Sequence, residues 1–215
     1  MSDRGAGRHL AVRGRPGPGV PAGAVLFLHG GKEQSTAAVT RYQLAVVRVA
    51  VLAAAVDRRL AGRDVAVWSL RFGVRGWNGD GSGPVADALW ALERVRAAYP
   101  APPPVVLAGH SMGGRTALRV AGSDGVAGVV ALAPWVPAGE PVAQVAGRRI
   151  VVAHGTEDDV TDPAASRRWV DRAREAGGDV RFEEVPGDGH AMVRHPRRWH
   201  ALTAAAVAGI LDLPG

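Results

Sequence analysis

The chain has 215 residues, a formal net charge of +6 and no cysteine. Its length suits one domain over residues 1–215, and its apolar fraction of 47% and charged fraction of 21% are ordinary for a soluble globular protein. The lack of cysteine excludes disulfides, thiolate metal sites and a cysteine nucleophile.

Apolar runs typical of strands alternate with runs typical of helices along most of the chain. Residues 1–22 are expected to form an N-terminal strand or loop region. In chain order, we then expect a strand at 24–28, a helix at 42–61, a strand at 64–70, a helix at 84–98, a strand at 105–108, a helix at 113–121, strands at 126–132 and 149–153, a helix at 163–176, a strand at 180–185 and a helix at 197–211. This alternation predicts an α/β fold with a mostly parallel sheet and helices on both faces. Prolines that suit the first turn of a helix stand at Pro84, Pro163 and Pro196.

The basic charge does not indicate a nucleic-acid partner. The arginines occur in small groups among Asp and Glu, without the basic and aromatic motifs of nucleic-acid binding. The longest apolar stretch, residues 44–56, is interrupted by Arg48 and is too short to span a bilayer. The N-terminus lacks the apolar core of a signal peptide. We therefore expect a cytoplasmic protein with no membrane partner, either a monomer or a homodimer.

The segment G-H-S-M-G at 109–113 follows directly on the apolar run at 105–108 and precedes a predicted helix. Ser111 therefore falls on a turn from a strand into a helix. The flanking glycines have no Cβ, so the chain can turn sharply and pack closely. The hydroxyl is left exposed at the top of the sheet, beside the positive end of a helix. Such a turn suits a nucleophile.

Other polar residues follow other predicted strands, and parallel strands bring these loops to one edge of the sheet. A serine nucleophile needs a base, the base needs an orienting carboxylate, and the developing oxyanion needs backbone N–H donors. Candidates for these roles occur in the chain order Ser, Asp, His. They lie at Ser111, in the acidic segment 154–159, in the segment 187–190 that ends in His190, and in the His-Gly-Gly turn at 29–31.

Together with the element order, these motifs resemble those of the α/β-hydrolases over nearly the whole chain. The small, lidless dienelactone-hydrolase-like and esterase-like members are the most similar. The resemblance implies the α/β-hydrolase fold without a cap domain, no cofactor, and a catalytic triad of Ser111, Asp158 and His190. Ser111 would attack the acyl carbon, His190 would transfer the proton, and Asp158 would orient the imidazole.

The same resemblance implies an oxyanion hole and a substrate pocket. The backbone N–H of Met112, the residue after the nucleophile, is expected to be one oxyanion donor. The second is expected from Gly31, with Lys32 as the next candidate. Residues 33–36 are expected to cover part of the site. The side chains expected to line the pocket are Lys32, Arg75, Trp77 and Trp135.

Other acids and histidines compete for the triad roles. Asp159 and Asp162 lie near the same strand end, but the H-G-T-x-D pattern of similar hydrolases selects Asp158, and Asp162 suits a helix N-cap. His195 and His200 compete for the role of base, but neither follows the Gly-Asp-Gly loop, which we interpret as flexible. The five-residue spacing of these histidines does not favour a zinc or iron site, so we expect no metal. Three strand-end histidines are interpreted as structural or packed: His29, His110 and His154.

A serine nucleophile in a lidless site predicts hydrolysis of a small carboxylic ester. Thioester or amide cleavage uses the same acyl-enzyme steps and stays open. A catalytically silent ligand-binding protein on the same scaffold is the alternative from a different class. An interaction module that uses the basic surface is a third possibility.

Overall fold

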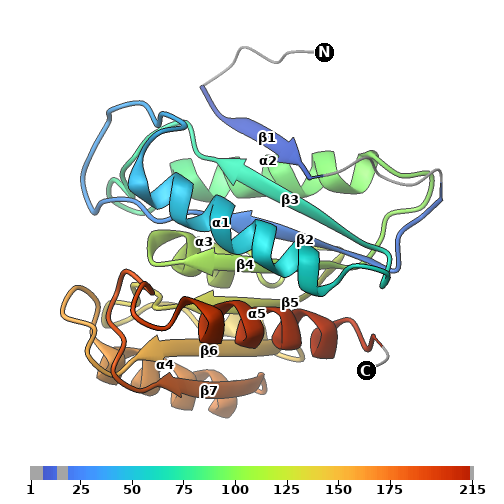
Figure 1. Ribbon diagram of the computed structural model, residues 1–215. Coiled ribbons are helices and arrows are strands. Elements are labelled where there is room, and N and C mark those ends of the chain that lie inside the picture. Colours follow the sequence, from blue (N-terminus) through green and yellow to red (C-terminus); the bar gives the residue numbers. More distant parts are fainter. Residues whose placement is uncertain (1–6, 14–18, 214–215) are drawn as a thin grey trace.

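The computed structural model describes residues 7–13 and 19–213. In this part of the chain, the helices pack around one seven-stranded sheet. The strand order is β1-β3-β2-β4-β5-β6-β7, with β1 antiparallel to β3 and all other neighbours parallel (Figure 1). The strands are β1 His9–Val12, β2 Gly23–Leu28, β3 Val65–Arg71, β4 Val105–His110, β5 Val126–Leu132, β6 Arg149–Gly155 and β7 Asp179–Val185. The helices are α1 Leu44–Arg59, α2 Ser82–Ala97, α3 Met112–Arg119, α4 Pro163–Glu175, α5 Pro196–Ile210 and the short 3-10 helix η1 Ala143–Val145.

This architecture confirms the predicted α/β-hydrolase fold, with small differences at the ends of elements. Strands β4 and β6 each continue two residues beyond the predicted end, because their ladders run on into the loops that follow. Helix α2 begins at Ser82, so Pro84 is its third residue rather than its first. Pro163 and Pro196 are the first residues of their helices, as predicted. Strand β1 lies within the expected N-terminal strand or loop region, and η1 was not expected.

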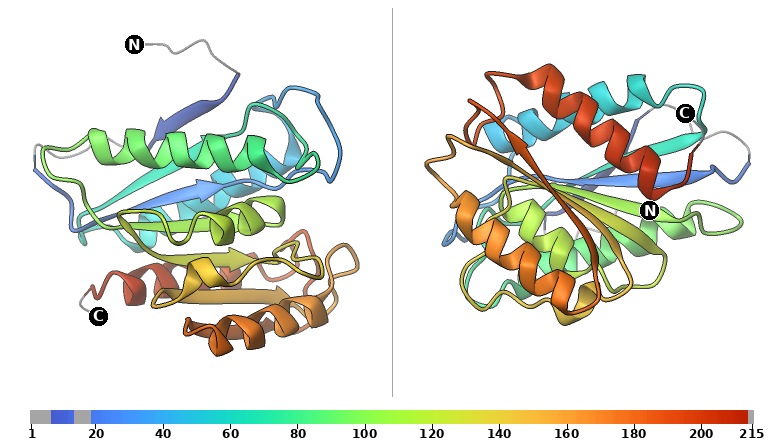
Figure 2. Two further views of the ribbon diagram at one scale, coloured as in Figure 1. Left: turned by 180° about the vertical axis from the view of Figure 1, so that it is seen from behind. Right: turned by 90° about the horizontal axis from the view of Figure 1, so that it is seen from below.

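Helices α1 and α5 cover one face of the sheet, and α2, α3 and α4 cover the other (Figure 2). Successive side chains of a strand point to opposite faces. In β2, Val25 and Phe27 pack with α1 and α5, whereas Leu26 and Leu28 pack with the other three helices. Both faces of the central strands β2, β4, β5 and β6 are buried, which is why these strands are continuous apolar runs in the sequence.

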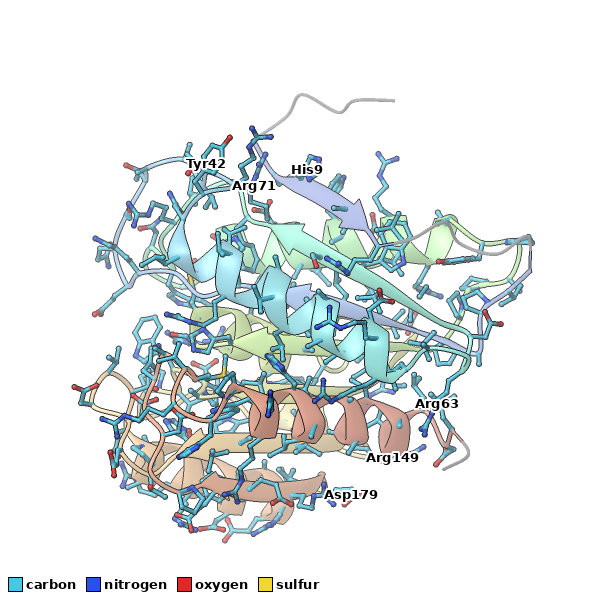
Figure 3. The ribbon with its side chains drawn as sticks, viewed as in Figure 1. His9, Tyr42, Arg63, Arg71, Arg149 and Asp179 are labelled. Carbon is cyan, nitrogen blue, oxygen red and sulfur yellow. The ribbon has the colours of Figure 1, made fainter. Side chains whose placement is uncertain are left out.

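The strand order changes direction between β2 and β4. From β2 the chain passes to β3 on one side, and then returns to β4 on the other side. In open α/β sheets, a ligand crevice lies outside the carboxyl ends of the strands at this point. Figure 3 labels Arg149 and Asp179 at the amino ends of β6 and β7, away from Tyr42, which precedes α1 near the carboxyl ends.

A buried guanidinium joins α3 to the loops that follow β3 and β5. The Cζ atom of Arg115 lies 4.0 Å from the ring centroid of Trp77 and 4.4 Å from that of Trp135. Its Nε donates to Glu140 Oε2 at 2.6 Å, and Arg119 pairs with the same carboxylate. The Glu140 side chain has no exposed surface. The charges are thus paired and packed between aromatic rings.

Two neutral histidines stand at neighbouring strand ends. His29 follows β2 and His110 ends β4, and both are buried. His29 Nε2 accepts the N–H of Phe72 at 3.1 Å, which ties β2 to the loop after β3. His110 Nε2 donates to the carbonyl of His190 at 2.9 Å. Burial is the largest cause that lowers the pKa of His29 to about 4 and the pKa of His110 to about 3.

We expect Glu140→Ala to lower the free energy of unfolding by about 3–5 kcal/mol, because Arg115 then keeps its buried charge without a counter-ion. The control is Glu183→Ala, since Glu183 pairs with Arg181 at the surface, where an ion pair contributes at most about 1 kcal/mol. Denaturant unfolding followed by circular dichroism measures both losses. Equal losses in the two variants would contradict this reading of the buried cluster.

We also expect the free energy of unfolding to fall as the pH is lowered from about 7.5 to about 5. In the unfolded chain His29 and His110 bind protons near pH 6.5, but their lowered pKa values keep them neutral in the folded chain. The unfolded state therefore binds more protons, so stability falls by up to about 1.4 kcal/mol per pH unit for each histidine. Urea unfolding at a series of pH values measures this slope. Replacing the exposed His9 with Gln should leave the slope unchanged, and a flat profile in the parent protein would refute the assignment.

Candidate active site

Ser111 lies on a strained turn between β4 and α3. Its φ of 56° and ψ of −118° place a residue with a side chain in a region that favours glycine. The Ser111 N–H donates to the carbonyl of Leu132 in β5 at 3.0 Å. A Cβ on Gly109 would lie 2.2 Å from the Gly113 carbonyl oxygen, and a Cβ on Gly113 would lie 2.3 Å from that of Leu28. Both glycines are therefore required by the close packing of α3 against β2 and β4.

Three side chains from different loops form a hydrogen-bonded chain. His190 Nε2 lies 3.1 Å from Ser111 Oγ, and His190 Nδ1 lies 2.9 Å from Asp158 Oδ2. Ser111 follows β4, Asp158 follows β6 and His190 follows β7. The carboxyl ends of the parallel strands thus bring together the three residues that the sequence singled out.

The Asp158 carboxylate accepts hydrogen bonds from several groups besides His190. Its Oδ1 accepts the backbone N–H groups of Val160 and Thr161 at 2.9 and 2.8 Å. Its Oδ2 accepts His154 Nε2 at 3.1 Å and the Thr161 hydroxyl at 2.9 Å. Burial alone raises the pKa of Asp158, but these bonds outweigh it, that from His154 first among them, and hold the pKa well below its usual range. The carboxylate therefore stays ionised at neutral pH.

The competing acids and histidines do not enter this hydrogen-bonded chain. Asp159 is exposed, and Asp162 caps α4 by accepting the N–H of Ala164 at 2.8 Å, as its sequence position suggested. His195 is exposed just before α5, and His200 lies within α5. Within residues 7–13 and 19–213, neither histidine bonds to the serine or to the buried carboxylate.

The loop that carries His190 is tied down, although the Gly-Asp-Gly sequence suggested flexibility. Asp188 is buried, and its Oδ2 accepts the N–H of His195 at 2.8 Å and the indole N–H of Trp199 at 2.9 Å. The Asp188 carbonyl accepts the N–H of Glu157 at 3.0 Å. These bonds fasten the loop both to α5 and to the loop after β6. Asp188 thus positions the loop of His190, a role that its place between two glycines did not suggest.

His154 and Thr161 are further residues whose place in the site the sequence did not show. His154 Nδ1 lies 2.9 Å from Ser166 Oγ, while its Nε2 faces Asp158. The Thr161 hydroxyl also lies 3.1 Å from His190 Nδ1. One feature of the sequence could have indicated their place. His154 and Thr161 flank Asp158 in the segment that follows the predicted strand at 149–153.

The two backbone N–H groups expected to form the oxyanion hole belong to Met112 and Gly31. Met112 is the first residue of α3, where helix N–H groups have no intrahelical acceptor. A Cβ on Gly31 would lie 2.5 Å from Met112 Sδ, so the two residues are in contact. The Gly31 N–H donates to no other described residue. The Lys32 N–H donates to the Arg75 carbonyl at 2.8 Å, so Lys32 was wrong as the next candidate for the second oxyanion donor.

The loops after β2 and β3 are joined along their length. Arg75 accepts from Lys32, and the Trp77 N–H donates to the Lys32 carbonyl at 2.8 Å. The Asn78 side chain accepts from the Ser35 N–H at 2.8 Å and donates to the Ser35 carbonyl at 2.9 Å. Residues 33–36, expected to cover part of the site, are thus held against residues 76–78.

The residues expected to line the pocket differ in exposure. Lys32 is exposed, and Arg75 and Trp135 are half-buried. Trp77 is only 2% exposed, and its ring packs edge-on against that of Trp135 with the centroids 6.2 Å apart. Trp77 therefore supports Trp135 from beneath and offers almost no surface of its own.

Two negative findings apply to the part of the chain that the structure describes. It contains no cluster of three or more His, Cys, Asp or Glu side chains arranged to hold a metal ion. None of its helices has both the length and the apolar character needed to cross a membrane.

Known structures share this fold over almost the whole chain. An α/β-hydrolase enzyme, MGS-M1, from a Medee basin deep-sea metagenome library has a TM-score of 0.76 and 20% identity, covering 98% of this chain and 96% of its own. XC6422 from Xanthomonas campestris, an α/β serine hydrolase without a lid, has a TM-score of 0.63 and 23% identity, covering 97% and 90%. The esterase Est2 from the planctomycete Thermogutta terrifontis, with propionate bound, has a TM-score of 0.68 and 20% identity, covering 97% and 91%.

At these identities the structural similarity establishes the fold alone. No curated protein sequence matches the chain. The model of the family described as serine aminopeptidase, S33, matches residues 19–151, which is more than half of the sequence. The chain therefore belongs to the serine aminopeptidase S33 family of α/β-hydrolases.

Proposed function

We propose that the protein hydrolyses small carboxylic esters through an acyl-enzyme intermediate. The observation that carries the proposal is the hydrogen-bonded chain from Ser111 Oγ through His190 to Asp158, with distances of 3.1 and 2.9 Å. A serine hydroxyl is a weak nucleophile at neutral pH, and an adjacent, oriented imidazole is the usual way to activate it.

Each residue of this chain has a distinct role in the proposed reaction. Ser111 Oγ attacks the ester carbonyl carbon as His190 Nε2 removes the hydroxyl proton. His190 then gives that proton to the leaving alcohol, which departs and leaves an acyl-serine. Water, deprotonated by His190, attacks the acyl-serine, and His190 returns that proton to Ser111 Oγ as the carboxylic acid is released. Asp158 stays ionised throughout, holds the imidazole tautomer and stabilises the imidazolium.

The tetrahedral intermediates need donors for their oxyanion. We assign this role to the backbone N–H of Met112, the residue after the serine, and to that of Gly31, whose backbone packs against the Met112 side chain. Lys32, Arg75 and Trp135 are proposed to border the acyl or alcohol group, with Trp77 supporting Trp135.

The connection between β5 and β6 favours a small or exposed substrate. Its residues 133–148 form only a loop and η1. Ser111 is only 8% exposed, less than its place on the turn suggested, but no cap lies over the strand ends at this position, so the proposed reaction needs no interfacial activation. Esterases occur among the similar structures. The S33 family description adds support for a second candidate, cleavage of an amide by the same residues.

We expect Ser111→Ala and His190→Ala each to lower kcat/KM for short-chain aryl esters by about 10⁴-fold. The nucleophile and its base act together, so the loss of either one disables both. Thermal unfolding should change little. A fluorophosphonate probe should add one label to the parent protein, on Ser111 by peptide mapping, and none to either variant. Ser123→Ala is the control that keeps the label.

Full activity in His190→Ala would place the base elsewhere. A folded parent protein that takes up no label would favour a catalytically silent, ligand-binding protein, and its bound ligands would then be sought by native mass spectrometry.

We expect Asp158→Asn to lower kcat by about 10³–10⁴-fold, because an amide cannot hold the same imidazole tautomer. Asp159→Asn should change kcat less than about threefold, since its exposed side chain belongs to no bond of the triad. Steady-state kinetics on one ester compares the two variants. The reverse order of damage would move the acid to the neighbouring position.

A further inference from the structure

A groove between α1 and α5 lies beside the loop of His190 but is not part of the triad. It has a volume of about 260 Å³ and is lined by α1, by the residues that follow His190 and by the first turns of α5. Figures 1 and 2 show α1 and α5 side by side on the same face of the sheet. The proposed reaction gives this groove no role.

The α1 side of the groove is an exposed apolar stripe. Leu44, Val47 and Val51 are spaced i, i+3, i+7, so they lie along one face of the helix. All three are exposed, Leu44 by 78%. Val193, which is 66% exposed, lies on the opposite wall. Apolar residues that are exposed together, rather than scattered singly, mark binding surfaces.

One cation lies within this stripe. Arg48 lines the groove and is half-buried, and its side chain forms no hydrogen bond or ion pair with any described residue. Burial lowers the pKa of Arg48, which reflects partial loss of water around the guanidinium. The groove also holds His200, whose pKa is lowered by burial and then by Arg59 and Arg58, so its ring is neutral at pH 7. The charge of the groove is therefore that of Arg48.

These features distinguish between possible occupants. In a two-fold dimer the same patch faces itself, which would bring the two Arg48 side chains toward one another across a partly desolvated interface. An apolar chain with an anionic end satisfies both parts of the groove, because the stripe accepts the chain and the guanidinium accepts the anion. The groove volume of about 260 Å³ leaves room for an aliphatic chain of medium length.

We propose that the groove binds a linear aliphatic carboxylate of medium length, with its chain along Leu44, Val47 and Val51 and its carboxylate on Arg48. The planar guanidinium donates two parallel N–H groups to a carboxylate, a geometry that an alcohol cannot match. The proposal does not depend on the proposed reaction, since no atom of the ligand needs to reach the serine.

Isothermal titration of the full chain with octanoate, octan-1-ol and acetate tests the proposal. Octanoate should bind at least about tenfold more tightly than octanol, and acetate should not bind measurably. Arg48→Gln should remove the advantage of octanoate over octanol and leave the affinity for octanol unchanged. Val47→Asp should weaken both ligands. Arg41→Gln, an exposed arginine just before α1, is the matched control and should leave both affinities unchanged.

The Ser111→Ala variant separates the groove from the proposed active site. Retained octanoate binding supports a distinct site, and its loss would place the ligand at the serine and overturn the proposal. Unchanged octanoate affinity in Arg48→Gln would also overturn it. So would a concentration-dependent dimer that Val47→Asp disperses, or binding to anionic vesicles by a protein with no affinity for monomeric octanoate.

Discussion

The close approach of α3 to the ends of β2 and β4 is the constraint on which the rest of the site depends. No side chain can occupy Gly109 or Gly113, because carbonyl oxygens fill the space where a Cβ would stand. Because these two glycines have no side chains, the first turn of α3 can lie beside the serine and next to the turn after β2. The serine accepts an unfavourable backbone conformation at this point. Burial of Arg115 between Trp77 and Trp135 holds the helix in that position.

The sequence predicts the parts of this arrangement that depend on local patterns. Apolar runs identify six of the strands, and four of these, β2, β4, β5 and β6, are buried on both faces along nearly their whole length. Ser111, Asp158 and His190 were candidates because each lies in the turn or loop after one of these runs, and parallel strands must bring such loops to one edge. The choice of Asp158 over Asp159 came from the resemblance to similar hydrolases rather than from any local pattern.

Contacts between loops were beyond the reach of the sequence. Asp188 stands between two glycines and has the sequence context of a mobile turn, yet it is buried against an indole from α5. Glu140 lies in a short Pro- and Gly-containing loop, and nothing in that pattern indicates that it pairs with two arginines of α3. Similarly, the Lys32 N–H donates to the carbonyl of Arg75, which lies more than forty residues away in the sequence. Such pairings are set by the packing of whole elements, which only the folded chain specifies.

The distances along the chain between the three hydrogen-bonded residues have a consequence for the order of events during folding. Ser111 and His190 are separated by 79 positions, and His190 and Asp158 by 32. Strand β7 is the last strand of the chain and also stands at the edge of the sheet. Pairings between such distant segments form slowly, because chain entropy is lost before the contacts form. Until β7 and α5 dock, the His190 imidazole is not bonded to the serine, which is then chemically an ordinary alcohol. A nascent or partly unfolded chain therefore carries no activated hydroxyl.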